Sequence, residues 1–348
     1  MAPTTAKALV TRVDGDKSTM GIKNMPVPKI EPHQLLVRVG SVAQNPTDVQ
    51  SLDGSAFGNG AVLGCDFAGT VEKLGDRVTT VKVGDRIAGL IWGGEVPGLG
   101  AYSQYTIADE KICFKVPENI SSAGAATVPL AAGTAWLALY SETCLNISRT
   151  GKNATPILVW GGSSSVGNYT IQLARIYSIP VVTVCSPKNF DLCKRLGATH
   201  VFDYRDADVI AKIKSATPNI QHVFDTIGDE ISSVTASQAV SEKGGVLCTV
   251  RPGKLFTERV DSNVNVTDVL VWTVFLKDHQ YKEFKWPASS GDHALGIELF
   301  ENISGWLKDG TLQANTPKVL AGGLSAIPEG FQMHRDGKIS GFKLVYEL

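Results

Sequence analysis

The chain has 348 residues, of which 33 are lysine or arginine and 34 are aspartate or glutamate, and its formal net charge at pH 7 is -1. This length predicts about two domains, each able to bury a core, and the balanced charge argues against a nucleic-acid partner. Hydrophobic residues make up 43% and charged residues 19% of the chain, which excludes the disordered and fibrous classes.

The cysteines and the apolar runs bear on where the protein works. Six cysteines are scattered without a C-x-x-C pair, which predicts reduced thiols, mostly in the core, and a cytoplasmic location. The N-terminal segment lacks the apolar region of a signal peptide, and the longest apolar run, residues 269–276, is too short to cross a bilayer. We therefore expect no membrane segment.

The first third of the chain alternates short β-like segments with glycine turns. The predicted strands cover residues 6–12, 34–40, 63–75, 83–92, 101–108 and 112–117. Closely spaced strands of this kind are typical of an antiparallel barrel or sandwich.

The pattern changes after residue 121, where an alanine-rich stretch, residues 121–140, predicts a long helix. Strand-like and helix-like segments then alternate up to residue 253, which indicates βαβ units and a parallel sheet. The run 266–276 is a candidate for the closing strand of this sheet. An amphipathic helix over residues 293–310 and β-like segments at 317–322 and 343–348 follow.

A small-residue loop joins the first strand of the parallel sheet to the next helix. It consists of Gly161, Gly162, Ser163, Ser164, Ser165, Val166 and Gly167. Glycines let a backbone approach a pyrophosphate, and the helix N-terminus offers unpaired N–H groups and a partial positive charge. The loop therefore predicts a dinucleotide site, and a simple tight turn is the alternative.

The next strand, residues 181–185, indicates which dinucleotide is bound. Sites that prefer NAD place an acidic residue after this strand, whereas this chain has Ser186, Pro187, Lys188 and Asn189. A hydroxyl and an ammonium favour the 2′-phosphate of NADPH. Tyr204 is a further candidate contact to the adenine or the phosphate. Asp191 keeps NAD open as an alternative, and Lys188 could equally be a solvated surface lysine.

Other chemistry has little support in the sequence. The six histidines are dispersed, no set of cysteines and histidines has metal-ligand spacing, and no common hydrolase motif occurs. We expect no metal, and we expect redox chemistry carried by a nicotinamide cofactor.

Taken in order, several motifs resemble the medium-chain dehydrogenase/reductase superfamily over almost the whole chain. They lie at residues 44–48 (QNPTD), 64–69 (GCDFAG), 83–86 (VGDR), 100–105 (GAYSQY), 161–167 (GGSSSVG) and 337–341 (GKISG). The resemblance implies an α/β protein with a doubly wound Rossmann sheet and a GroES-like β-rich domain. The predicted domains are residues 1–122 with 279–348 (GroES-like, substrate and catalysis) and 123–278 (Rossmann, NADPH).

The resemblance is strongest to the zinc-free branch, because Asn45 and Cys65 stand where zinc-dependent relatives have a cysteine and a histidine. Within that branch the chain is most similar to fungal trans-acting enoyl reductases that work beside polyketide synthases. This resemblance implies NADPH contacts from the glycine loop, the 186–189 segment and Tyr204. Further implied cofactor contacts are Asn45, Pro46, Thr47, Asp48, Val250, Gly341 and Phe342.

Two departures from that group concern the chemistry. Gln50 stands where a lysine is expected near the substrate carbonyl, and Ala131 stands where a hydroxyl is expected, with Thr134 one turn on. We expect hydride addition to the β-carbon of an α,β-unsaturated thioester or carbonyl, with Gln50 donating to the enolate oxygen. Tyr102 or a water is the expected proton source, with Thr134 as a third catalytic candidate. Ala131, Thr134 and Phe275 are the predicted substrate contacts.

Two alternatives remain open for the function. One is a quinone or alkenal reductase that acts on free small molecules. The other is a non-catalytic NADPH-binding protein that docks a synthase. The expected partners are a small-molecule or carrier-bound enoyl substrate and a polyketide synthase.

Overall fold

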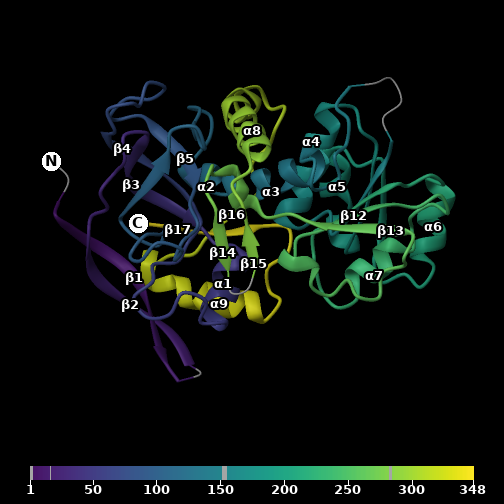
Figure 1. Ribbon diagram of the computed structural model, residues 1–348, viewed down its shortest axis with the longest axis horizontal. Helices are drawn as coiled ribbons and strands as arrows, with labels where there is room; N and C mark the ends of the chain where they lie inside the picture. The colour runs from purple at the N-terminus through teal and green to yellow at the C-terminus, as the bar shows by residue number, and fades with distance from the viewer. Residues whose placement is uncertain (1–2, 16, 151–154, 282–283) are drawn as a thin grey trace. The chain divides into compact units, whose positions relative to one another are not determined.

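A computed structural model describes residues 3–15, 17–150, 155–281 and 284–348 (Figure 1). The chain forms two compact units. Unit 1 comprises Met1–Leu130 and Phe300–Leu348, and unit 2 comprises Ala131–Leu299. The divisions fall inside helices α3 (Pro129–Tyr140) and α8 (Ser290–Asp309), later than the predicted positions 122 and 279. The sequence pattern changes where a new element begins, whereas these two helices continue from one unit into the other.

Unit 1 is built on a sheet that joins distant parts of the chain. In the described residues this sheet has seven strands in the order β16-β17-β3-β4-β5-β7, with β6 also paired to β3. The strands are β3 (Gln34–Ala43), β4 (Asp66–Leu74), β5 (Arg86–Leu90), β6 (Tyr105–Asp109), β7 (Cys113–Lys115), β16 (Pro317–Val319) and β17 (Lys343–Glu347). The antiparallel pairing of β17 with β3 confirms that the C-terminal segment completes the β-rich domain.

A long ribbon of two antiparallel strands, β1 (Thr5–Asp14) and β2 (Lys17–Pro26), is drawn in purple in Figure 1. The sequence did not predict β2, because half of its residues are polar and none of them is buried. The remaining helices of unit 1 are short: α1 (Pro46–Asp53), α2 (Ser122–Ala126) and α9 (Ile327–Arg335).

Unit 2 contains the predicted parallel sheet. Its order is β10-β9-β8-β11-β12-β13, the doubly wound arrangement of a Rossmann domain. The strands are β8 (Ile157–Trp160), β9 (Val181–Cys185), β10 (His200–Asp203), β11 (His222–Asp225), β12 (Gly245–Thr249) and β13 (Val264–Asp268). The connecting helices are α4 (Ser165–Ile176), α5 (Phe190–Leu196), α6 (Val209–Ala216) and α7 (Ser232–Ser237). Strands β8 and β9 are buried along their whole length, as expected of central parallel strands.

Two predicted elements differ from those observed. The run 266–276 is a strand only up to Asp268, and Val271–Val274 forms a 3-10 turn, where the Thr273 hydroxyl bonds back to the Leu270 carbonyl at 2.9 Å. The predicted helix 121–140 is broken into α2 and α3 just before Pro129, which lacks the N–H that a continuous helix would use.

The stretch Ser122–Tyr140 is the one described segment whose length and composition would suit a membrane span, and 94% of its most apolar window is buried.

All six cysteines are free and buried, which confirms the predicted thiols. A small antiparallel pair, β14 (His279–Tyr281) and β15 (Phe284–Trp286), completes unit 2.

Candidate active site

The loop between β8 and α4 is packed too closely for side chains at two of its glycines. A Cβ on Gly162 would lie 2.1 Å from the Thr183 hydroxyl oxygen, and one on Gly167 would lie 2.3 Å from the Gly161 carbonyl oxygen. Gly161 itself has φ +93, in the region that favours glycine. The loop therefore presents bare backbone at the start of α4, which is the geometry that a pyrophosphate needs.

The hydroxyl of Ser164 caps α4 and is held by Thr226. Ser164 Oγ accepts from the Gly167 N–H at 2.9 Å and lies 2.8 Å from Thr226 Oγ1. Thr226 Oγ1 also lies within 3.0 Å of the Trp160 and Gly161 carbonyl oxygens. Because the hydrogen of Thr226 points to a carbonyl, Ser164 donates its own hydrogen to Thr226. The Ser164 hydroxyl thus fixes the loop, and Thr226 is a positioning residue that the sequence analysis missed.

A second missed residue, Asp225, shapes the neighbouring loop at the end of β11. Its buried carboxylate accepts hydrogen bonds from the Ser232 and Ser233 hydroxyls at 2.6 and 2.7 Å and from the N–H groups of Ile227 and Gly228. Burial raises the pKa of Asp225, and these four hydrogen bonds oppose that rise. The carboxylate therefore anchors the loop that follows Thr226.

The other predicted cofactor residues of unit 2 follow the ends of parallel strands. Because the carboxyl ends of such strands share one edge of the sheet, these residues lie along the same edge as the glycine loop. The segments concerned are 161–167 after β8, 186–189 after β9, Tyr204 after β10 and Val250 after β12. The fold thus brings together what the sequence placed in separate segments.

The segment after β9 carries an exposed positive charge at this edge. Lys188 and Pro187 are exposed, Ser186 is half-buried, and Asn189 is buried. Asp191 is also exposed on the first turn of α5.

The exposed ring of Tyr204 lies beside the Arg205 guanidinium. The carbon of that guanidinium is 5.5 Å from the ring centroid, and the group bonds to the Asp203 carboxylate at 3.0 and 3.1 Å. An aromatic face and cationic groups on exposed positions can hold an adenine and a phosphate.

Unit 1 holds a buried polar cluster at the start of α1, whose members are Asn45, Asp48, Asp66, Tyr102 and Lys343, each no more than 2% exposed. Asp48 Oδ2 accepts from the Asn45 N–H at 2.8 Å and from the Tyr102 hydroxyl at 3.0 Å. Asp66 Oδ2 accepts from the Asn45 amide at 2.9 Å and from the Lys343 ammonium at 2.6 Å. The cluster therefore satisfies most of its own polar groups inside unit 1.

Within this cluster, the charged form of Asp48 is disfavoured. Burial raises its pKa to about 6, and the nearby Asp66 adds to the rise, whereas the hydrogen bonds of Asn45, Cys65 and Tyr102 lower it. Its second oxygen, Oδ1, has no hydrogen-bond partner. Burial and Asp48 together hold the pKa of the Cys65 thiol well above its usual range.

The predicted catalytic residues Gln50 and Tyr102 differ strongly in their exposure to solvent. Gln50 is exposed on α1, whereas Tyr102 is completely buried with its hydroxyl on Asp48. Pro46 is exposed and Thr47 half-buried, while Asn45 and Asp48 point into the cluster. The roles of these residues toward a cofactor or a substrate stay predictions.

The remaining predicted contacts are divided between the units. In unit 2, Ala131 and Thr134 are buried one turn apart on α3, and Phe275 is half-buried after the 3-10 turn. In unit 1, Gly341 has φ +75, and the Lys318 ammonium lies 4.8 Å from the centroid of the half-buried Phe342 ring.

The part of the chain that the structure describes does not fit a zinc site. No group of three histidine, cysteine or carboxylate side chains is placed to hold a metal within it. Asn45 turns its amide N–H toward Asp66, and the Lys343 ammonium already lies against the same carboxylate. A fixed ammonium would repel a divalent cation there.

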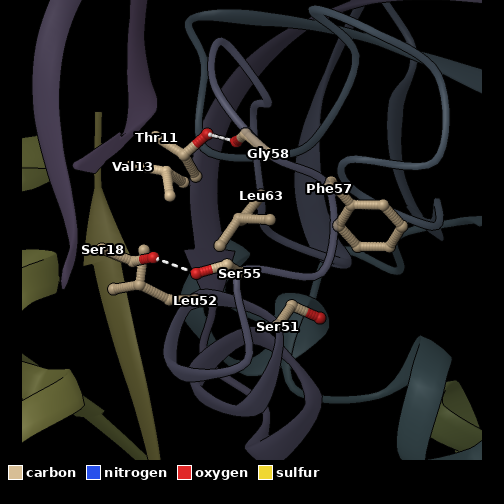
Figure 2. Close-up of a pocket in the computed structure, with 9 residues that line it drawn as sticks. All are labelled: Thr11, Val13, Ser18, Ser51, Leu52, Ser55, Phe57, Gly58 and Leu63. Atoms are coloured by element: carbon tan, nitrogen blue, oxygen red, sulfur yellow. Dashed lines mark hydrogen bonds between the residues drawn. The ribbon is translucent and has the colours of Figure 1, made fainter. Parts of the chain in front are cut away.

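A hollow in unit 1 is a weaker candidate site (Figure 2). Its empty volume is about 170 Å³ including its open mouth. The Ser18 and Ser55 hydroxyls bond to each other at 2.6 Å, and the Thr11 hydroxyl bonds to the Gly58 carbonyl at 2.7 Å. The hydroxyl groups that line this hollow are therefore already hydrogen-bonded within the protein.

Comparison with known families agrees with this architecture. The alcohol dehydrogenase GroES-like domain family matches residues 31–118, and the zinc-binding dehydrogenase family matches residues 165–272. Among solved structures, the quinone oxidoreductase from Coxiella burnetii has a TM-score of 0.76 at 22% identity and covers 99% of both chains. The CurK enoyl reductase has a TM-score of 0.75 at 18% identity and covers 97% of this chain and 98% of its own.

Curated relatives narrow the class. A trans-enoyl reductase of Alternaria alternata, ACTTS2, is 34% identical and covers 99% of both chains. A dehydrogenase of Monascus pilosus, mokE, is 34% identical over 93% of this chain and 92% of its own, and a zinc-type alcohol dehydrogenase-like protein of Schizosaccharomyces pombe is 33% identical over 96% and 98%. The chain belongs to the medium-chain dehydrogenase/reductase superfamily, in the group that holds the fungal trans-enoyl reductases.

Replacing Gly162 by alanine tests the close packing of the glycine loop. We expect Gly162→Ala to lower the free energy of unfolding by about 1 to 3 kcal/mol, because the new Cβ collides with Thr183. Thr183→Ala in the same background should recover part of the loss. Gly305→Ala is the matched control, since its Cβ would meet nothing within 4 Å and the helix should gain up to about 1 kcal/mol. Urea unfolding measures both, and equal stability of Gly162→Ala and wild type would contradict the packing argument.

The raised pKa of Asp48 predicts a pH-dependent stability difference. The folded protein holds this proton up to about pH 6, whereas the unfolded chain releases it near 3.8. The wild type should therefore lose stability as pH rises between these values, while Asp48→Asn keeps both accepted hydrogen bonds and does not titrate. From pH 4 to pH 7, the stability of Asp48→Asn relative to wild type should rise by roughly 2 to 3 kcal/mol in urea unfolding. The exposed Asp76→Asn serves as control, and a difference that does not change with pH would refute the prediction.

Proposed function

We propose that this protein is an NADPH-dependent, zinc-independent reductase of an activated carbon–carbon double bond, acting on an enoyl thioester in trans to a polyketide synthase. The observation that carries the proposal is the bare-backbone loop at the carboxyl edge of the parallel sheet, with an exposed lysine after the neighbouring strand. The names of the trans-enoyl reductase relatives support the substrate class. We place the protein in the cytoplasm, in agreement with its free thiols.

The residues of unit 2 fit the cofactor part of this proposal. The N–H groups at the start of α4 would hold the pyrophosphate, while Ser186 and Lys188 would hold the 2′-phosphate and Tyr204 the adenine. Val250 would lie along the same edge, and Asn45, Pro46, Thr47, Asp48, Gly341 and Phe342 would be the contributions of unit 1. When bound, NADPH supplies the hydride that adds to the β-carbon of the polarised double bond.

The chain's own residues would then stabilise the charge that develops on the substrate. Gln50 is exposed and can donate its amide N–H to the carbonyl oxygen as negative charge grows there. A water is a better source of the proton for the α-carbon than Tyr102, because the buried Tyr102 hydroxyl donates to Asp48. Ala131, Thr134 and Phe275 are the proposed substrate contacts, and catalysis by Thr134 remains part of the proposal.

The decisive experiment gives the purified protein NADPH together with one of three hydride acceptors, an enoyl thioester, a quinone or a free alkenal. The absorbance of the nicotinamide is followed in each case. Oxidation with an enoyl thioester supports the proposal. Oxidation with a quinone or a free alkenal alone would replace it by a reductase of free small molecules. Calorimetric binding of NADPH with no oxidation by any acceptor would make the protein a non-catalytic accessory.

Lys188 should decide between the two nicotinamide dinucleotides. We expect Lys188→Ala to raise the Kd for NADPH about tenfold and to leave the Kd for NADH within about twofold, because only NADPH carries the 2′-phosphate. Lys194→Ala, at an exposed lysine on α5, is the control and should change neither value. Calorimetry measures all four constants, and an equal loss for both cofactors would remove Lys188 from phosphate recognition.

Gln50 should matter for turnover rather than for folding. We expect Gln50→Ala to lower turnover about a hundredfold, since one donor to a developing oxyanion is worth roughly 3 kcal/mol. Gln50→Lys should keep or raise turnover because an ammonium is the stronger donor. The melting temperature and the Kd for NADPH should stay unchanged in both, and Gln238→Ala is an exposed control. Unchanged turnover in Gln50→Ala would exclude the role.

A further inference from the structure

Two cysteines lie in contact on either side of the proposed 2′-phosphate segment. The sulfurs of Cys185, the last residue of β9, and Cys193 on α5 are 3.6 Å apart, and both side chains are buried. Between them in sequence lie Ser186, Pro187, Lys188 and Asn189. The mechanism proposed above makes no use of either thiol.

The hydrogen bond inside this pair gives its two sulfurs different characters. The Cys193 thiol donates to the Cys185 sulfur, which lowers the pKa of Cys185 and raises the pKa of Cys193. Cys185 is therefore the sulfur more readily present as thiolate, which is the form that reacts with oxidants. Cys193 is placed as the resolving thiol.

A second pair of cysteines in unit 2 shows the contrast. The thiols of Cys144 and Cys248 lie near backbone carbonyl oxygens, those of Asp268 at 3.5 Å and Thr249 at 4.0 Å. Burial holds the pKa of Cys248 well above its usual range, and the hydrogen bond between Cys248 and Cys144 adds to the rise. Cys248 therefore lacks the lowered pKa that the hydrogen bond from Cys193 gives to Cys185.

We propose that Cys185 and Cys193 form a thiol–disulfide site that takes a peroxide as its oxidant and that weakens NADPH binding when oxidised. The Cys185 thiolate attacks one oxygen of hydrogen peroxide, the O–O bond breaks, and the hydroxide released takes up a proton. The resulting sulfenic acid is attacked by Cys193, whose proton leaves with the hydroxyl group as a second water. Overall two thiols and one peroxide give one disulfide and two waters.

The expected effect on NADPH follows from where the two sulfurs are anchored. A disulfide needs the sulfurs to approach to about 2.05 Å, so they must move closer together. Strand β9 is paired on both sides, with β8 and β10, and resists movement. The shift therefore falls on α5 and on the turn in which the Asn189 N–H bonds to the Ser186 carbonyl at 2.8 Å. This part of the inference rests on the proposed function, because it takes that turn as the 2′-phosphate site.

The test for the bond itself uses the intact, fully reduced protein and hydrogen peroxide at a few equivalents. We expect peptide mass spectrometry without reductant to find Cys185 joined to Cys193, with a phosphine reductant reversing the link. Cys185→Ser should abolish sulfenic acid trapping by dimedone, whereas Cys193→Ser should increase it. Cys113→Ser is the control and should behave as wild type. If Cys144 and Cys248 join first, or if no Cys185–Cys193 peptide forms, the proposal is wrong.

Calorimetry with NADPH tests the consequence. We expect the oxidised protein to bind NADPH at least fivefold more weakly than the reduced protein, and Cys193→Ser to keep its affinity after peroxide treatment and reduction of the sulfenic acid. A disulfide that leaves the Kd unchanged would overturn the regulatory part. If the reduced wild type does not bind NADPH at all, the proposed function fails instead, while the mass spectrum still decides the thiol site.

Discussion

The carboxylate of Asp66 is the point on which the assembly of unit 1 depends. One of its oxygens accepts the N–H of Leu130 at 2.7 Å, and the other accepts from Asn45 and Lys343. These partners come from the start of α3, the N-terminus of α1 and the C-terminal strand β17, so one buried group joins segments from both ends of the chain. A buried charge is tolerated only when it is paired and its remaining lone pairs accept hydrogen bonds. The positions of all three segments are therefore fixed by the same carboxylate.

Among the described residues, the same ion pair leaves the buried cluster of unit 1 poorly suited to hold a metal ion. The ammonium of Lys343 forms an ion pair with the Asp66 carboxylate, and the side-chain amide of Asn45 donates a hydrogen bond to the same carboxylate. Asp48, left with one unpartnered oxygen and a raised pKa, adds electrostatic strain without adding a ligand. The cluster is thus a structural core beneath α1, and α1 in turn presents Gln50 at its surface.

The sequence could predict features that local pattern encodes. The alternation of strands and helices marks the parallel sheet, and the glycines at 161, 162 and 167 mark the turn between β8 and α4. Pairings between distant residues leave no such trace: nothing near Ser164 points to Thr226, and nothing near Asp66 points to Lys343. The hydrogen bond of Tyr102 was missed for the same reason, since its partner Asp48 lies on another element. Strand β2 was not predicted because its residues are exposed or half-buried and show no apolar alternation.

The proposed site combines two kinds of construction with different tolerance to change. The glycine loop is made of backbone held by close packing and by the hydrogen bonds that run from Gly167 through Ser164 to Thr226, so side chains cannot easily be added to it. Lys188, in the turn after β9, and Gln50, on α1, are both exposed side chains. Under the proposed function, substitution at such positions would change the preference for cofactor or substrate at little cost in stability. If the proposed function holds, cofactor and substrate preference would rest on exposed positions of this kind, and Gln50, which stands where a lysine is expected, is one of them.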